Sequence, residues 1–170
     1  MTHVKLLQLT RENFAPFGEL LMLDGAEHFP INRGSTERYH ALSQVDVQSN
    51  GGAPIISLFR GQAFQLPFQL SVMERHPLGS QAFIPLTKDP LQRYLVIVAK
   101  PCYQTEIEIT QNLCAFIAHG FTGVSYAKGV WHHPLVSLDE VSDFIVVDRK
   151  GPGNNCDEIE LTSQFIVDRV

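Results

Sequence analysis

The stretch ERHPLGSQ, residues 74–81, decides the fold class because its pattern is a strand, a sharp turn and a second strand. Residues two apart on a strand share a face, so Glu74 and His76 should point into one cavity while Arg75 points away. The proline and glycine of this stretch force the turn. Gln81 then starts the next strand opposite His76. The pattern therefore predicts that a carboxylate, an imidazole and an amide oxygen converge.

Short apolar runs of strand length lie on both sides of this stretch. They are rich in Val, Ile and Phe, which suit a pleated surface, and Pro and Gly fall mostly between them. The expected strands cover residues 53–60, 68–74, 82–86, 93–99, 113–118 and 143–147. This pattern predicts one all-β domain over residues 1–170, a sandwich or a barrel.

Outside the strands, the sequence carries few helix signals. Thr10 is expected to cap a short helix within residues 11–17. Residues 157–170 have no decisive periodicity, so their secondary structure stays open.

A second segment that can carry chemistry is GVSYAKGVWHHP, residues 123–134. Adjacent residues on a strand face opposite ways, so only one of His132 and His133 can reach an interior site. The other is a packing or surface residue. If His132 faces inward, Trp131 faces the other side, where it is more simply a packed aromatic residue than a functional one.

Composition excludes several classes of partner. Thirteen basic against eighteen acidic residues give a net charge of -5, which argues against a nucleic-acid-binding surface. The longest apolar run, residues 94–99, is far shorter than the ~20 residues of a membrane-spanning helix. Met1–Lys5 lacks the pattern of a signal peptide, and three widely spaced cysteines suggest free thiols. We therefore expect a cytoplasmic protein that binds neither membrane nor nucleic acid.

The two segments resemble the two cupin motifs. The first motif, His-x-His-x4-Glu, corresponds here to Glu74, His76 and Gln81, and the second, Pro-x-Gly-x-x-His, ends here at His132 with Ala127 in place of the proline. The resemblance implies Glu74, His76, Gln81 and His132 as metal ligands. Such a set suits a borderline divalent ion, with Ni²⁺ favoured and Mn²⁺ or Zn²⁺ as alternatives. The competing interpretation is a metal-free pocket in which these groups hydrogen-bond one another.

Longer blocks resemble the ureidoglycolate lyase family, in the family's order and over almost the whole chain. They are residues 31–34, 37–40, 74–85, 130–135, 148–149 and 155–157. The resemblance implies a cupin-like β-barrel, a double-stranded β-helix or jelly roll with a few short helices. It also implies a homodimer, a role in allantoin catabolism, and an associated divalent metal for which nickel is the usual suggestion.

The reaction implied by the resemblance is elimination of urea from (S)-ureidoglycolate to leave glyoxylate. The hydroxyl proton must leave as the carbon–nitrogen bond breaks, and the departing nitrogen must gain a proton. Glu74, His76 and His132 are the catalytic candidates, because a metal can stabilise the developing alkoxide and a histidine or carboxylate can move protons. No covalent nucleophile is needed.

The carboxylate of this substrate needs a cationic partner. Lys128 is a candidate because it lies in the segment that leads to His132. Arg38 is a second candidate, with Tyr39 and His40 beside it, against the alternative of a surface ion pair. Arg75 is expected to be structural or to lie at a dimer contact, since strand alternation turns it away from Glu74 and His76.

Three alternatives remain open at this point. The same pocket could release ammonia from the ureido group, as an amidohydrolase would. It could also serve another metal-dependent cupin reaction on a small hydroxy acid, and dependence on O₂ would reveal an oxygenase. A non-catalytic sensor on the same barrel would normally carry a DNA-binding helical module, for which 170 residues leave no room.

Overall fold

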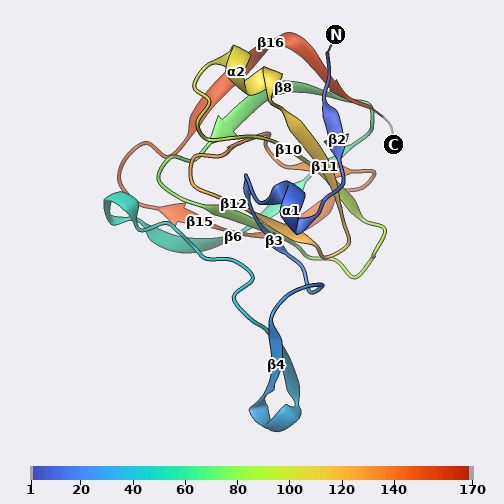
Figure 1. Cartoon of the computed structure of the whole chain (residues 1–170), viewed down its shortest axis with the longest axis vertical. Helices are drawn as coiled ribbons and strands as arrows, with labels where there is room; N and C mark the ends of the chain where they lie inside the picture. Colours follow the sequence, from blue (N-terminus) through green and yellow to red (C-terminus); the bar gives the residue numbers. More distant parts are fainter. Residues whose placement is uncertain (1, 169–170) are drawn as a thin grey trace.

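Two β-sheets and a projecting hairpin make up the computed structural model, which describes residues 2–168 (Figure 1). The first sheet runs in the order β1-β16-β8-β13-β10-β11-β2, and β14 and β7 extend it beside β10. The second sheet has the order β3-β12-β9-β15-β6. Strands distant in sequence are neighbours in both sheets, so the all-β jelly-roll prediction is confirmed.

The elements have the following bounds. The strands of the first sheet are β1 (Thr2–His3), β2 (Lys5–Leu7), β7 (Ala63–Phe64), β8 (Phe68–Arg75), β10 (Arg93–Ala99), β11 (Cys114–His119), β13 (Trp131–His132), β14 (Val136–Leu138) and β16 (Asp157–Val167). The strands of the second sheet are β3 (Gly18–Leu21), β6 (Ala53–Gly61), β9 (Gln81–Pro85), β12 (Gly123–Tyr126) and β15 (Ser142–Lys150). Strands β4 (His28–Ile31) and β5 (Thr36–Tyr39) form the hairpin, and the helices are α1 (Arg11–Phe14), α2 (Glu106–Gln111), η1 (Asn32–Gly34) and η2 (Ser49–Gly51). All six strands expected from the sequence are present, to within a few residues at their ends.

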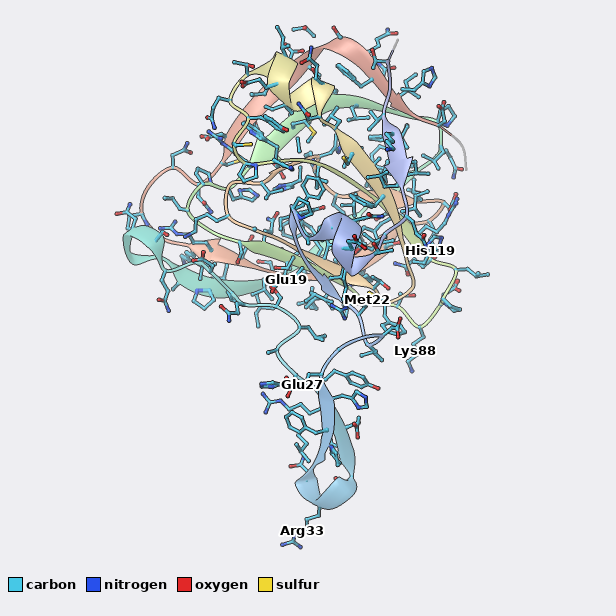
Figure 2. All side chains as sticks on the ribbon, in the orientation of Figure 1. Glu19, Met22, Glu27, Arg33, Lys88 and His119 are labelled. Carbon is cyan, nitrogen blue, oxygen red and sulfur yellow. The ribbon has the colours of Figure 1, made fainter. Side chains whose placement is uncertain are left out.

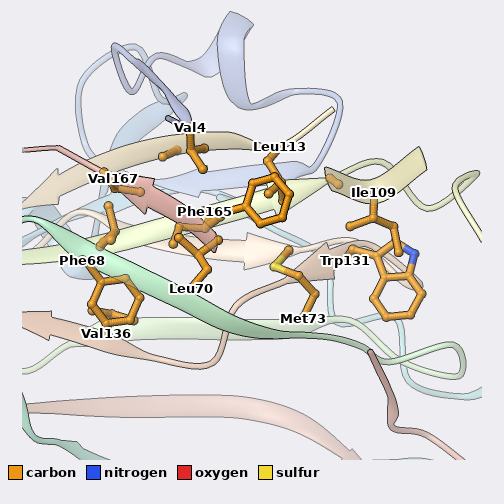
Figure 3. Packing of buried hydrophobic residues seen from close by; sticks show 14 of the residues in the cluster. Val4, Phe68, Leu70, Met73, Ile109, Leu113, Trp131, Val136, Phe165 and Val167 are labelled. Carbon is orange, nitrogen blue, oxygen red and sulfur yellow. The ribbon is translucent and has the colours of Figure 1, made fainter. Parts of the chain in front are cut away.

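Strand β10 lies between two hydrophobic cores, which explains why its apolar residues run on without alternation. Tyr94, Val96 and Val98 pack toward the second sheet, against residues such as Phe144 and Phe83. Leu95 and Ile97 pack on the other side, against β8 and β16, in the cluster drawn in Figure 3. Both faces of β10 are therefore buried, and the strand contributes side chains to both cores.

Each of the two short α-helices adds one buried residue to a core, Phe14 of α1 and Ile109 of α2. Thr10 caps α1 as predicted, since its hydroxyl accepts from the backbone N–H of Asn13. Helix α2 was not predicted, although Thr105 and Glu108 carry the sequence signature of a capping box and form one. The residues left open at the C-terminal end form β16 within the described part, which pairs with β8 on both sides of a register shift between Glu160 and Phe165.

The β4–β5 hairpin extends away from the barrel, on the side of the second sheet (Figure 1). Figure 2 shows Arg33 at its tip and Glu27 at its base. The tip turns through Asn32 and Arg33, both with positive φ. Phe29 and Tyr39 are each about 36% exposed, so this two-stranded element has little core of its own.

No helix of the described residues is long and apolar enough to cross a membrane.

Candidate metal centre and active site

Glu74, His76 and His132 converge inside the barrel. Glu74 on β8 lies directly opposite His132 on β13, so their side chains share a face. His132 Nε2 is 3.4 Å from Glu74 Oε1, and the ring centroids of His76 and His132 are 5.1 Å apart. One ligand atom of each of the three residues lies within 4.8 Å of the others. The structure therefore brings together three of the four ligand candidates.

The hydrogen bonds of the two imidazoles define which nitrogen faces the cluster. Nδ1 of His76 donates to the carbonyl of Asn155 over 2.6 Å, and Nδ1 of His132 donates to the carbonyl of Val130 over 3.0 Å. In a neutral ring the remaining Nε2 then carries a lone pair. Both Nε2 atoms are buried without a hydrogen-bond partner. Two bare lone pairs beside a carboxylate form a cluster that a cation would satisfy, and a backbone carbonyl on the second nitrogen is typical of metal-binding histidines.

Glu74 provides the negative charge of the cluster. Burial acts to raise its pKa, but the contact with His132 and the proximity of His76 outweigh burial, so the pKa lies below the ordinary value. Glu74 is thus a carboxylate at neutral pH. Its other oxygen lies 4.0 Å from the thiol of Cys156.

The fourth ligand candidate, Gln81, is buried on the neighbouring strand β9. It lies directly opposite Tyr126 of β12, whose ring stacks on His132 with centroids 4.3 Å apart. Burial raises the pKa of Tyr126 well above its ordinary value, with a further contribution from Glu74, so its hydroxyl stays protonated. The Gln81 side-chain oxygen is buried without a partner. Gln81 and the stacked Tyr126 therefore form one wall of the site.

Asp148 is a second residue of this wall that the sequence analysis missed as a site residue. It lies on β15 just beyond the pair Val147–Ala82, and its Oδ2 accepts a long hydrogen bond of 3.5 Å from the Gln81 amide. Burial raises the pKa of Asp148, partly offset by the Gln81 hydrogen bond and by His76. Its Oδ1 is buried without a partner. The pairing of β15 with β9 brings this residue to the cluster, so the residues next to it in the sequence do not predict its position in the site.

Gly129 determines the conformation of the loop that leads to His132. Its φ of 77° is unfavourable for other residues, and its N–H donates to the carbonyl of His76 over 2.9 Å, which joins the two motifs. Lys128 in this loop binds Asp46 at 3.0 Å and the Ser49 hydroxyl at 2.6 Å. The ammonium group is thus held against the loop that precedes β6. No contact of Lys128 with the cluster is present among the described residues.

The substrate-binding candidates of the hairpin region lie outside the barrel. Arg38 and Tyr39 are exposed on β5, and the Tyr39 ring stacks on His28. His40 lies at the hairpin base and lines a surface cavity of about 410 Å³ together with Arg11 and Glu19. Within one chain the structure does not bring these three predicted residues to the Glu74 cluster, because the hairpin projects away from it (Figure 1).

The neighbours of the cluster residues face the directions that strand alternation predicts. His133 points away from the site and packs edge-on against Phe68. Trp131 is 2% exposed, and its indole N–H donates to the carbonyl of Tyr103. Arg75 binds Asp157 at 2.9 Å and stacks over Trp131. All three side chains therefore make packing or polar contacts with residues outside the cluster.

Comparisons with known proteins match this sequence to one family. The family model "Ureidoglycolate lyase" matches residues 1–168. A protein of Burkholderia cepacia named "Ureidoglycolate lyase" is 53% identical over 158 residues, 93% of this chain and 86% of the relative. Proteins of the same name from Pseudomonas savastanoi pv. phaseolicola and Pseudomonas paraeruginosa are 48% and 44% identical, over 88% and 93% of this chain and 85% and 90% of theirs. The chain belongs to the ureidoglycolate lyase family.

Proposed function

We propose that this protein is a ureidoglycolate lyase, which eliminates urea from (S)-ureidoglycolate and leaves glyoxylate in the degradation of allantoin. Family membership supports this function, and the relatives named above carry it as their name. The single structural observation that carries the proposal is the pair of bare imidazole nitrogens beside the Glu74 carboxylate. Such a cluster can bind a hydroxy acid through a metal ion.

Glu74, His76, His132 and Gln81 are the proposed metal ligands. All four present a nitrogen or oxygen donor, and the unpartnered Nε2 atoms of His76 and His132 and Oε1 of Gln81 support a cation at this place. Two imidazoles, one carboxylate and one amide suit Ni²⁺, with Mn²⁺ or Zn²⁺ as alternatives. When bound, a divalent ion supplies electrostatic stabilisation to the oxygen on which negative charge develops.

The chain's own groups supply orientation and proton transfer. Asn155 and Val130 hold the two imidazoles in one tautomer through their carbonyls, so both rings aim Nε2 at the cluster. Glu74 is ionised, and we propose it together with the histidines as the group that moves protons between the hydroxyl and the departing nitrogen. Burial of His132 at 1% exposure keeps this exchange away from bulk water.

Lys128 is our proposal for the cation that attracts the substrate carboxylate. Its loop is hydrogen-bonded to His76 through Gly129, which ties the residue next to Lys128 to the first motif. Its contact with Asp46 is partly exposed and exchangeable. Arg38, Tyr39 and His40 could reach substrate only from a second chain, because their hairpin leaves the barrel of its own chain.

We further propose that the protein is a homodimer joined through the outer face of the second sheet. Leu58, Ile145 and Ile84 lie side by side across β6, β15 and β9 on this face. Ile56 and Leu58 are 74% and 56% exposed, an apolar surface that is unusual on a monomer. The hairpin projects from the same side and needs packing partners of its own (Figure 1).

A cytoplasmic location is part of the same proposal. Cys102, Cys114 and Cys156 are all free thiols, which is the state that a reducing compartment maintains.

The substitution H132A tests the site directly. Removing this imidazole should lower metal content and abolish urea release, while circular dichroism and oligomeric state stay those of the unaltered protein. The matched control is H119A, which removes an exposed histidine at the end of β11. Near-normal turnover in H132A would contradict the placement of the active site in this cluster.

A further inference from the structure

Two buried oxygen acceptors in the wall of the site have no partner and no assigned role toward substrate. They are Oε1 of Gln81 and Oδ1 of Asp148. Buried polar atoms without partners are rare in folded proteins and usually mark a place where a ligand, ion or water completes the set. The Gln81 oxygen is accounted for by the proposed metal, whereas the Asp148 oxygen is not.

The position of Asp148 follows from the strand register. On β15, Phe144 and Val146 point into the core between the sheets, and alternation places Asp148 on the same inner face. Asp143 and Ile145 point to the outer face, where Asp143 binds Arg60. Asp148 is therefore the one acid on the inward face of β15, which it shares with Ser142, Phe144 and Val146.

Asp148 is linked to the metal candidates through Gln81, whose amide donates to Asp148 Oδ2 over 3.5 Å. No arginine or lysine is paired with Asp148 among the ion pairs of the described residues. This acid thus has a free acceptor beside the metal candidates and no cation to neutralise it.

The proposed substrate offers the matching donors. Its carboxylate and hydroxyl oxygens suit a cation, whereas its ureido end carries N–H groups that need acceptors. We infer that Asp148 binds the ureido group, with Oδ1 accepting hydrogen bonds from its N–H donors. This inference deepens the proposed function, because it assigns the urea-releasing end of the substrate to the β15 side of the site. The same contact would hold urea as a product.

A purely structural role for Asp148 makes a different prediction. If Asp148 served only to orient the Gln81 amide, its loss would disturb the metal ligands and weaken every ligand of the site equally. If it binds the ureido group, loss of Asp148 would affect urea and spare glyoxylate. The two product molecules therefore separate the roles.

The experiment measures the dissociation constants of urea and of glyoxylate by NMR titration of the metal-loaded protein. We expect D148A to weaken urea binding by at least about tenfold, since hydrogen bonds to a charged acceptor are stronger than neutral ones. Glyoxylate binding and metal content should stay within about twofold, because neither depends on an N–H acceptor. The variant D148N keeps the volume of the side chain and tests the same contact if D148A folds poorly.

The control is D143A, which removes an acid from the outer face of the same strand. It should leave both dissociation constants unchanged. Unaltered urea affinity in D148A and D148N would overturn the inference, and so would a parallel loss of glyoxylate or metal. Failure of the proposed function is seen separately, as the absence of urea among the products of the unaltered protein.

Discussion

The interior of the barrel and the surface that carries the hairpin differ in whether one chain provides packing partners for their side chains. Inside, β8, β9, β13 and β15 each contribute a polar side chain to one site, and apolar clusters surround it. Outside, Ile56 and Leu58 face solvent and the hairpin has little core. The difference is the one expected if the residues of the cluster come from a single chain and the outer sheet face packs against a second chain, as proposed above.

The largest effect is expected inside the barrel, for E74Q. Glutamine keeps the shape of the side chain and removes only the charge, so the two bare imidazole nitrogens would face a neutral amide. Loss of even a supporting group of a metal site typically costs 10–100-fold, so kcat/KM should fall by at least about 100-fold. Metal analysis and steady-state kinetics measure the change. Activity within threefold of normal, roughly the scatter of such substitutions, would show that the Glu74 charge is dispensable.

Metal removal tests the same region without changing a residue. Chelation should abolish lyase activity, and Ni²⁺ or Mn²⁺ should restore it. The thermal unfolding curve should remain cooperative, because both hydrophobic cores are complete without the cluster. Full activity of thoroughly metal-free protein would favour a metal-free polar pocket instead.

The outer face is tested by L58E. A charge at the centre of the apolar face should convert the proposed dimer to monomer, which analytical ultracentrifugation would report. The substitution removes the stabilisation from burying one apolar side chain, about 1.5–3 kcal/mol, and adds the cost of desolvating a carboxylate. The control L91E alters a residue that is 78% exposed in the turn before β10, and should leave the mass unchanged. A dimeric L58E would place the interface elsewhere.

The smallest effect is expected for T105A, far from both regions. The capping box of α2 loses the hydroxyl that accepts from the Glu108 N–H, so the free energy of unfolding should fall by about 1 kcal/mol. Denaturant unfolding measures it, with T110A as the control on the same helix. A change in kcat of more than about threefold would show that α2 is coupled to the site, contrary to this account.

The sequence predicted the elements whose signal is local. Alternation along residues 74–81 placed Glu74 and His76 on one face and Arg75 on the other, and the same rule separated His132 from His133. The Val- and Ile-rich runs predicted the strands for the same reason. These features depend on neighbouring residues alone.

The features that the sequence did not predict depend on long-range pairing. Asp148 and Tyr126 reach the site only through the registers of β15 and β12 with β9. Arg38 stays a predicted partner for the substrate carboxylate only from a second chain, because its hairpin leaves the barrel of its own chain. A pattern of side chains cannot show in which direction a two-stranded ribbon projects, because that depends on the backbone at its base.

The central claim is most directly tested by product analysis of the metal-loaded protein with racemic ureidoglycolate. The account predicts urea and glyoxylate in equal amounts, no ammonia, and consumption of one enantiomer only. Release of ammonia in place of urea would contradict the lyase assignment and indicate an amidohydrolase. Absence of any product in the presence of Ni²⁺ or Mn²⁺ would leave the fold and the cluster standing and remove the proposed function.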